Sequence, residues 1–195
     1  HSTHNITIQA TDSGGDTIDR SFVVTVLDIN DAPTAIALIP ATIIENSSIG
    51  TEIGLLSATD SDAGDTHTFS IISGQDLITI SGNQVLSKVG FDYETNTTHS
   101  VTIQVTDSGS ETYVDSFVIT ITIENETPTD LSFASTPIIE NSTIDTLIGT
   151  LTVVDPDTVD THTFSIISGQ DLITISGNQV LSKVAFDYES HSTHN

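Results

Sequence analysis

The sequence predicts an all-β protein made of tandem seven-stranded immunoglobulin-like β-sandwiches. Three observations lead to this fold class. One 95-residue pattern runs through the whole chain, short segments alternate apolar and polar residues, and turn signals separate those segments at short intervals.

The repeat is visible without any alignment to other proteins. DTHTFSIISGQDLITISGNQVLSKV occupies 65–89 and again, unchanged, 160–184, an offset of 95 residues. ITIQATDSGG at 6–15 matches VTIQVTDSGS at 101–110 with the same offset, and HSTHN stands at both 1–5 and 191–195. The chain is therefore about two periods of one tandem array.

Strand signals fill the middle period. Phe117, Ile119, Ile121 and Ile123 alternate with polar or smaller residues, as in a strand with one buried face, and Ser-Gly, Ser-Gly-Asn and Asp-Ser-Gly sequences mark turns. Seven short strands in about 90 residues are typical of an immunoglobulin-like sandwich. We expect them in order at 35–43, 51–58, 67–72, 76–80, 83–88, 99–106 and 112–123.

This register predicts the domain organisation. We expect the last two strands of a truncated domain at 1–27, a linker at 28–33, a complete domain at 34–123, a second linker at 124–128, and the first five strands of a truncated domain at 129–195. Each terminal piece contains the strands that the other lacks. We therefore expect neighbouring identical repeats as partners, joined covalently or through strand complementation.

Charge excludes several classes of function. The chain has 27 acidic and 3 basic residues, a net charge of −24, which argues against binding to nucleic acid or to anionic membranes. It has no Cys, and no apolar run approaches the roughly 18 residues of a membrane span. Repulsion among so many carboxylates opposes folding unless water or hard cations relieve it.

The acidic residues recur at fixed places in the repeat. Glu45 matches Glu140, the pair Asp60 and Asp62 matches Asp155 and Asp157, Asp92 and Glu94 match Asp187 and Glu189, and Asp12 matches Asp107. The first linker adds Asp28, Asn30 and Asp31 in LDINDAP, and the second adds Asn125 and Glu126 in IENETP.

This ordered set resembles the calcium-ligand motifs of cadherin repeats. Those repeats carry a Glu near the first strand, an Asp-x-Asp, an Asp-x-Glu, a later Asp on the penultimate strand, and a junction similar to Asp-x-Asn-Asp-x-x-Pro. The near-identical repeats look most like cadherin-like modules of large bacterial surface proteins. The resemblance implies Ca²⁺ as the cofactor, an extracellular or cell-surface location, and a metal role for all seventeen residues named above.

The resemblance also implies where each ligand would act. Asp28, Asn30 and Asp31 would join Asp60, Asp62 and Asp107 at the first junction, and Glu45, Asp92 and Glu94 would join Asp155 and Asp157 at the second. Calcium takes six to eight oxygen ligands, so several loops must contribute. Because Ile123 and Glu126 replace two Asp residues of the first linker, we expect weaker or fewer sites at the second junction.

Other acidic and histidine residues receive simpler interpretations. Asp65 and Asp160 are expected to be turn residues, and His67 and His162 ordinary strand residues. No Ser nucleophile elbow is present, and Asp92 with Glu94 lacks the aromatic residues of a sugar site, so we expect no enzyme.

The expected function is structural. The leading hypothesis is a calcium-rigidified extender segment of a long secreted or cell-surface adhesin or fibre protein. The alternative is the repeating subunit of an extracellular filament, in which 129–195 of one copy is completed by 1–27 of the next. A carbohydrate- or partner-binding module is a further alternative, which the low aromatic content of 5% disfavours.

Overall fold

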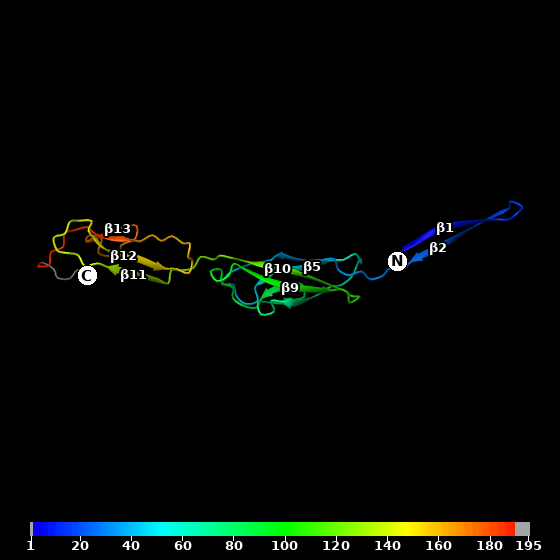
Figure 1. Cartoon of the computed structure of the whole chain (residues 1–195), viewed down its shortest axis with the longest axis horizontal. Helices are drawn as coiled ribbons and strands as arrows, with labels where there is room; N and C mark the ends of the chain where they lie inside the picture. The colour runs from blue at the N-terminus through cyan, green and yellow to red at the C-terminus, as the bar shows by residue number, and fades with distance from the viewer. Residues whose placement is uncertain (1, 190–195) are drawn as a thin grey trace. The chain divides into compact units, whose positions relative to one another are not determined.

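A computed structural model describes residues 2–189 and contains only strands as regular secondary structure in that range (Figure 1). Its residues form two compact units, the first from 2–91 and 98–121, and the second from 92–97 and 122–189. The repeated HSTHN segment at 191–195 and the end of the expected 129–195 domain lie outside the described residues. The all-β fold class predicted from the sequence is confirmed.

The first unit begins with a two-stranded hairpin. Strand β1 (Ser2–Thr11) pairs antiparallel with β2 (Thr17–Val26), from Ser2 opposite Val26 to Thr11 opposite Thr17. The side chains of Ile6, Ile8 and Phe22 stand exposed on this hairpin. The alternation of apolar and polar residues thus gives each strand of the hairpin one apolar face, and the side chains of that face are exposed to solvent.

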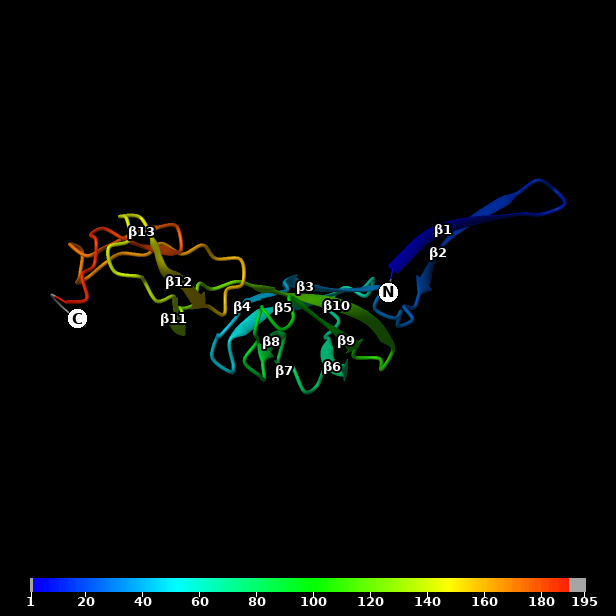
Figure 2. The same cartoon turned by 60° about the vertical axis from the view of Figure 1, so that its left-hand side comes forward.

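The rest of the first unit is a sandwich of two four-stranded sheets, which can be followed in Figure 2. One sheet has the order β3-β5-β8-β7 and the other the order β4-β10-β9-β6. The strands are β3 (Ala35–Pro40), β4 (Thr42–Ile44), β5 (Glu52–Thr59), β6 (Thr68–Ser73), β7 (Ile78–Ser81), β8 (Gln84–Ser87), β9 (Thr98–Thr106) and β10 (Thr112–Thr122).

The strand expected at 35–43 is divided in two. Ala41 has a φ of 59°, in the left-handed region, so the chain turns between β3 and β4. Strand β3 pairs with β5 in one sheet, whereas β4 lies beside β10 in the other. The first strand therefore contributes to both layers of the sandwich.

The core of the sandwich consists mainly of aliphatic side chains from both sheets, together with Phe91 from the loop between β8 and β9. Strands β9 and β10 contribute more than a third of them. The buried hydrophobic residues are Ile36, Leu38, Ile43, Ile53, Leu56, Ile78, Val85, Phe91, Val101, Ile103, Val105, Ile119 and Ile121. Burying an aliphatic side chain contributes roughly 1.5–3 kcal/mol, so these two strands supply a large share of the stability.

The second unit contains one four-stranded sheet with the order β11-β12-β14-β13. Its strands are β11 (Asp130–Ser135), β12 (Leu147–Val154), β13 (Ile173–Ser176) and β14 (Gln179–Ser182). They are the 95-residue equivalents of β3, β5, β7 and β8. The third of the five strands expected in this region does not form, although its sequence at 163–168 is identical to that of β6.

The missing strand has a physical explanation. In the first unit, β6 hydrogen-bonds to β9, from Thr68 opposite Thr106 to Ser73 opposite Thr102. Among the described residues of the second unit, no strand corresponds to β9 or β10. A strand needs a ladder partner for its backbone N–H and C=O groups, so identical sequence gives different structure in the two units.

Residues 2–189 contain no helix with the length and hydrophobicity needed to cross a bilayer.

Candidate metal-binding clusters

The first acidic cluster lies at one end of the sandwich and contains Asp60, Asp65 and Asp107. Each offers a carboxylate oxygen, and these oxygens lie within 4.8 Å of one another. Asp60 directly follows β5, and Asp107 directly follows β9, so the ends of strands from the two sheets position them. Asp65 lies in the loop between β5 and β6.

Hydrogen bonds hold these carboxylates in place. Asp60 accepts from the backbone N–H of Asp62 at 3.0 Å, and its other oxygen lies 3.0 Å from Nε2 of His67. The hydrogen bond from the backbone N–H of Asp62 is the largest of the causes that lower the pKa of Asp60. The hydrogen bond with His67 lowers this pKa further. Asp107 accepts from the backbone N–H of Glu111 at 2.8 Å. The carboxylates of Asp60 and Asp107 are thus both held in position by hydrogen bonds that they accept.

The first linker is attached to this cluster. The side-chain amide of Asn30 donates to Oδ2 of Asp107 at 3.0 Å, and the backbone N–H of Asp31 donates to Oδ2 of Asp62 at 2.7 Å. Gly109 leaves the space that Asn30 needs, because a Cβ there would overlap the Asn30 side chain. Five predicted ligands therefore lie in one network: Asn30, Asp31, Asp60, Asp62 and Asp107.

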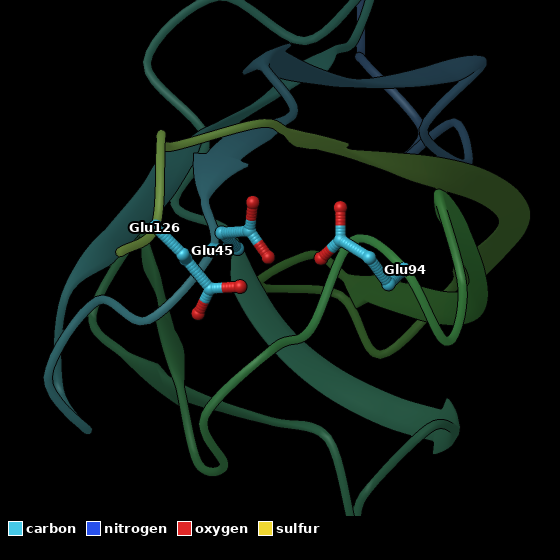
Figure 3. Close-up of side chains that lie close together, drawn as sticks. All are labelled: Glu45, Glu94 and Glu126. Atoms are coloured by element: carbon cyan, nitrogen blue, oxygen red, sulfur yellow. The ribbon is translucent and has the colours of Figure 1, made fainter. Parts of the chain in front are cut away.

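The second cluster contains Glu45, Glu94 and Glu126, each with a carboxylate oxygen within 4.8 Å of the others. Figure 3 shows their three carboxylates turned toward a common space. Glu45 directly follows β4 and is only 1% exposed. A buried carboxylate among like charges needs a compensating positive charge or hydrogen bonds.

Asp92, near this cluster in sequence, has a separate role. Its two oxygens accept from the backbone N–H of Thr95 at 2.9 Å and from the Thr95 hydroxyl at 2.8 Å. These two hydrogen bonds lower the pKa of Asp92 below its ordinary value. The bond from the Thr95 hydroxyl has the larger effect, and the bond from the Thr95 backbone N–H has the next largest. Asp92 thus closes a local turn and does not belong to the group of Glu45, Glu94 and Glu126.

The second unit reproduces the Asp-x-Asp arrangement. Asp155 lies 2.7 Å from Nε2 of His162 and accepts from the backbone N–H of Asp157 at 3.1 Å. Oδ2 of Asp157 accepts from the backbone N–H of Glu126 at 2.6 Å. The second linker thus repeats the bond that Asp31 makes in the first unit.

A third cluster repeats the second one by 95 residues. Glu140, Asp187 and Glu189 each offer an oxygen within 4.8 Å, and all three side chains are exposed. Glu140 accepts from the backbone N–H of Tyr188 at 3.3 Å, and Asp187 from that of Glu189 at 3.0 Å.

Two buried carboxylate oxygens indicate that a cation would fit the acidic clusters. Oδ1 of Asp157 and Oδ2 of Asp65 are inaccessible to water and have no hydrogen-bond partner among the described residues. Asp157 as a whole is 2% exposed. A buried carboxylate oxygen without a donor is costly, whereas a hard cation would satisfy it. The donor set, carboxylates with backbone and amide oxygens, fits Ca²⁺ better than Zn²⁺.

Some predicted ligands do not join a cluster. Oδ1 of Asp12 accepts from the backbone N–H groups of Gly14 and Asp16, both at 2.9 Å, and so shapes its own turn. The Asn125 amide donates to the backbone carbonyl of Glu126 at 3.0 Å. Asp28 belongs to none of the three clusters found among the described residues.

The sequence interpretation missed Asp65, His67 and His162. Asp65 does form the expected turn, with its N–H bonded to the carbonyl of Asp62, but its carboxylate also reaches Asp60 and Asp107. His67 immediately precedes β6 and therefore does not belong to a strand. Its ring contacts Asp60. The sequence signal that could have identified these residues is their recurrence 95 residues apart, as Asp65 with Asp160 and His67 with His162.

Comparisons of sequence connect the chain with cadherins. It is 30% identical to human Protocadherin Fat 4 over 78% of this chain, 28% identical to chimpanzee Protocadherin gamma-A10 over 79%, and 28% identical to mouse Protocadherin-16 over 95%. The chain spans only 3%, 18% and 6% of these relatives' own lengths. No protein-family profile matches the chain.

Comparisons of structure point to the same fold. The four extracellular cadherin domains 1–4 of Protocadherin Gamma B7 match with a TM-score of 0.71 at 19% identity, covering 97% of this chain and 51% of that one. Mouse Cadherin-23 domains EC22–24 match with a TM-score of 0.63 at 18% identity, covering 96% and 65%.

These relatives confirm the extracellular, cell-surface location expected from the sequence, and their names describe cadherins, not enzymes. Those with a stated source are animal proteins. The 95-residue period, the two-sheet sandwich and the acidic loops at its ends therefore identify the chain as a tandem array of cadherin-like β-sandwich domains.

Proposed function

We propose that this chain is a calcium-rigidified extender segment of a long secreted or cell-surface adhesin or fibre protein, of the repetitive kind found on bacteria. The exact repetition of 65–89 at 160–184 favours the bacterial setting. One observation carries the calcium proposal: Asp157 is almost fully buried, and its Oδ1 has no hydrogen-bond donor among the described residues.

The physical reason for a metal is the spacing of like charges. Three carboxylates with oxygens within 4.8 Å repel one another, and each cluster here contains three. A divalent cation converts this repulsion into attraction. Asp60, Asp65 and Asp107 with the linker residues Asn30 and Asp31 would hold one ion or group of ions, and Glu45, Glu94 and Glu126 would hold another.

Metal binding would stiffen the array because linker residues are among the ligands. Without metal, the first linker is held by a few hydrogen bonds, including those from Asn30 and Asp31. With metal, the same segment would be tied to several carboxylates at once. Extracellular calcium modules bind at about 10⁻⁴–10⁻³ M, which suits a stiff state outside the cell.

Calorimetric titration of the 195-residue chain with CaCl₂ tests the proposal. Asp157→Asn should lower the affinity of one class of sites at least about tenfold, because a ligand charge is lost. Asp171→Asn, a loop acid of the same unit outside the three clusters, is the matched control and should bind as the parent does.

X-ray scattering in calcium and in EDTA provides the mechanical readout. The parent chain should show a narrower distribution of shapes in calcium, and Asp157→Asn should lose part of that change. Absence of calcium binding in the parent at millimolar concentration would refute the calcium proposal.

A second candidate function is a subunit of an extracellular filament. It is favoured by the correspondence, at an offset of 95 residues, between the β1–β2 hairpin and the strands β9 and β10 that complete the middle sandwich. Light-scattering mass separates it from an extender: calcium changes the stiffness of either, but only a filament gains mass.

A further inference from the structure

A histidine of the β5–β6 loop faces the first acidic cluster. Nε2 of His67 lies 3.0 Å from Oδ2 of Asp60, and Oδ1 of Asp60 accepts from the backbone N–H of Asp62. The side chain of Asp60 is 4% exposed, so protein donors must replace the water that it has lost. A carboxylate only accepts hydrogen bonds, so Nε2 of His67 carries the hydrogen. Asp60 is therefore held from two directions, by its own loop and by the residue before β6.

This hydrogen bond joins the two sheets of the middle sandwich. Asp60 directly follows β5, a strand of one sheet, whereas His67 directly precedes β6, a strand of the other. Thr68 of β6 lies opposite Thr106 of β9, and Asp107 is the next residue after Thr106. The ladder between β6 and β9 thus fixes the backbone of His67 close to that of Asp107. The bond from His67 therefore sets where Asp60 lies relative to Asp107.

The same contact recurs one repeat later. Nε2 of His162 lies 2.7 Å from Oδ2 of Asp155, whose side chain is 5% exposed. The residues between the two partners differ from those of the first unit at three of six positions, with Pro, Thr and Val at 156, 158 and 159 in place of Ser, Ala and Gly. Residues 163–168 form no strand, although β6 follows His67 in the first unit. The contact is thus specified by the Asp and the His themselves.

We propose that His67 and His162 are positioning residues that make the Asp-x-Asp sites selective for Ca²⁺ over Mg²⁺. The proposal rests on the calcium-binding function proposed above and deepens it, because it assigns the choice of ion to specific residues. The Nε2 of each histidine carries a hydrogen that points at a carboxylate, so this atom acts on the ion only through the aspartate that it holds.

The size of the ion is the physical basis of this selectivity. Calcium binds six to eight oxygens at about 2.3–2.6 Å, whereas magnesium needs a near-octahedral set at about 2.0–2.1 Å. To bind magnesium directly, the carboxylates of Asp60 and Asp107 would have to move closer together. Asp107 is held by the backbone N–H of Glu111 at 2.8 Å, and Asp60 is held by His67. Carboxylates fixed in this way resist contraction, so magnesium keeps its water shell and binds weakly.

The first experiment titrates the 195-residue chain with CaCl₂ and, separately, with MgCl₂, and follows the binding by NMR. The backbone amide of Asp62 reports on this site, because the sequence around its equivalent Asp157 differs and gives a separate signal. His67→Leu removes the donor and should lower the calcium affinity at least about tenfold and the magnesium affinity less than about threefold. The ratio of the two affinities should therefore fall at least about threefold.

Two conservative variants at the same position test the geometry. His67→Gln carries its amide nitrogen where Nε2 of the imidazole lies, so it should keep the calcium affinity and the ion ratio within about threefold of the parent. His67→Asn carries its amide at the place of Nδ1, too short to reach Asp60, and should behave as His67→Leu does. A histidine that only filled space would show no such difference between Gln and Asn.

The matched control is His99→Leu. The ring of His99 packs against Phe91, with the ring centroids 5.1 Å apart. His99 is the second residue of β9, whereas Asp107 follows the other end of that strand. This substitution also replaces a histidine of the middle domain by leucine, but it should leave the binding of both ions at the Asp62 reporter as in the parent.

The second experiment measures hydrogen exchange in EDTA and so tests the positioning without any metal. The amide of Asp62 donates to Asp60, so it should exchange several-fold faster in His67→Leu, where Asp60 is held from one side only. His67→Gln should exchange as the parent does. The amide of Ile103, a fully buried residue, controls for any change in global stability.

Three results would overturn the proposal: equal losses of calcium and magnesium affinity in His67→Leu, failure of His67→Gln to retain the parent's selectivity, or unchanged exchange at Asp62 in His67→Leu. In each of these cases the parent still binds calcium, and the proposed function stands. Absence of calcium binding in the parent would instead refute the proposed function, and the selectivity with it.

Discussion

The backbone N–H of Asp31 donates a hydrogen bond to Oδ2 of Asp62, 2.7 Å away. One repeat later, the backbone N–H of Glu126 makes the same bond to Oδ2 of Asp157 at 2.6 Å. The bond survives the change from Asp to Glu in the linker because it uses the backbone and not the side chain. Each linker is therefore tied to the Asp-x-Asp loop that follows it, before any metal is considered.

Gly109→Ala should loosen the first linker. A Cβ at position 109 would overlap the Asn30 side chain, so the bond from Asn30 to Asp107 must break or shift. Crowding of this kind typically costs about 1–3 kcal/mol. We expect calcium affinity to fall about tenfold in a titration. Gly14→Ala, at the equivalent hairpin position where the nearest atom is Asp12 Oδ1 at 3.3 Å, should bind as the parent does.

Asp65→Asn should weaken calcium binding without unfolding the loop. The turn bond comes from the backbone N–H of Asp65, which this substitution leaves in place. The charge near Asp60 and Asp107 is lost, so we expect an affinity about three- to tenfold lower by calorimetry. The matched control is Asp76→Asn, a loop acid outside the three clusters. Equal affinity of Asp65→Asn and the parent would remove Asp65 from the ligand set.

Ile103→Ala and Ile8→Ala form a matched pair at equivalent positions. Ile103 is fully buried, so its truncation should destabilise the middle domain by about 2–5 kcal/mol in urea unfolding. Ile8 is largely exposed, so in dilute protein its truncation should cost less than about 1 kcal/mol. A large loss from Ile8→Ala in dilute monomer would mean that the hairpin packs within its own chain.

Thr95→Val should raise the pKa of Asp92 in metal-free protein. The Thr95 hydroxyl contributes most to the lowered pKa, and Val cannot donate that bond. A carboxyl group with a lowered pKa in the folded state stabilises it above the ordinary value of 3.8, and this contribution disappears as the pH falls through the lowered value.

The stability difference between parent and Thr95→Val should therefore be larger at pH 7 than at pH 2. Carboxyl NMR titration in EDTA follows Asp92 directly. A midpoint for Asp92 that is the same in both proteins would contradict the assignment to Thr95.

Ile123→Asp should strengthen the second linker as a calcium site. It restores the Asp that position 28 provides in the first linker, and it adds a carboxylate beside Glu124 and Asn125. We expect a calcium site at least several-fold tighter than in the parent, measured by titration. Ile123→Asn, of similar size without the charge, is the control. If the second linker already binds as tightly as the first, the substitution will add nothing.

The sequence alone predicted the middle sandwich well because its evidence is local. Alternation located the strands of 35–122 within a few residues, and the 95-residue order of acidic residues indicated which loops carry carboxylates. The division at Pro40 and Ala41 was not predictable, since it depends on how one strand serves two sheets.

The second unit shows where local sequence fails. Phe164 and Ile166 stand in a segment identical to β6, yet no strand forms there. Pairing depends on a partner far away in sequence, so no property of 163–168 predicts it. Asp65 and His67 were missed for a related reason: a turn residue and an alternating residue have ordinary local patterns, and only the folded loop brings them to Asp60.

The order of strands along the chain has a consequence for synthesis. The sheet β3-β5-β8-β7 is complete at Ser87, whereas the strands that cover it end at Thr122, 35 residues later. Synthesis adds about 5–20 residues per second, so roughly 2–7 s pass between the completion of the first sheet and the synthesis of the strands that cover it. Because successive repeats are nearly identical, a nascent sheet can capture the hairpin of a neighbouring chain in that interval. We therefore expect a long array to fold most faithfully when its chains are delivered one at a time or when a holdase shields the exposed face.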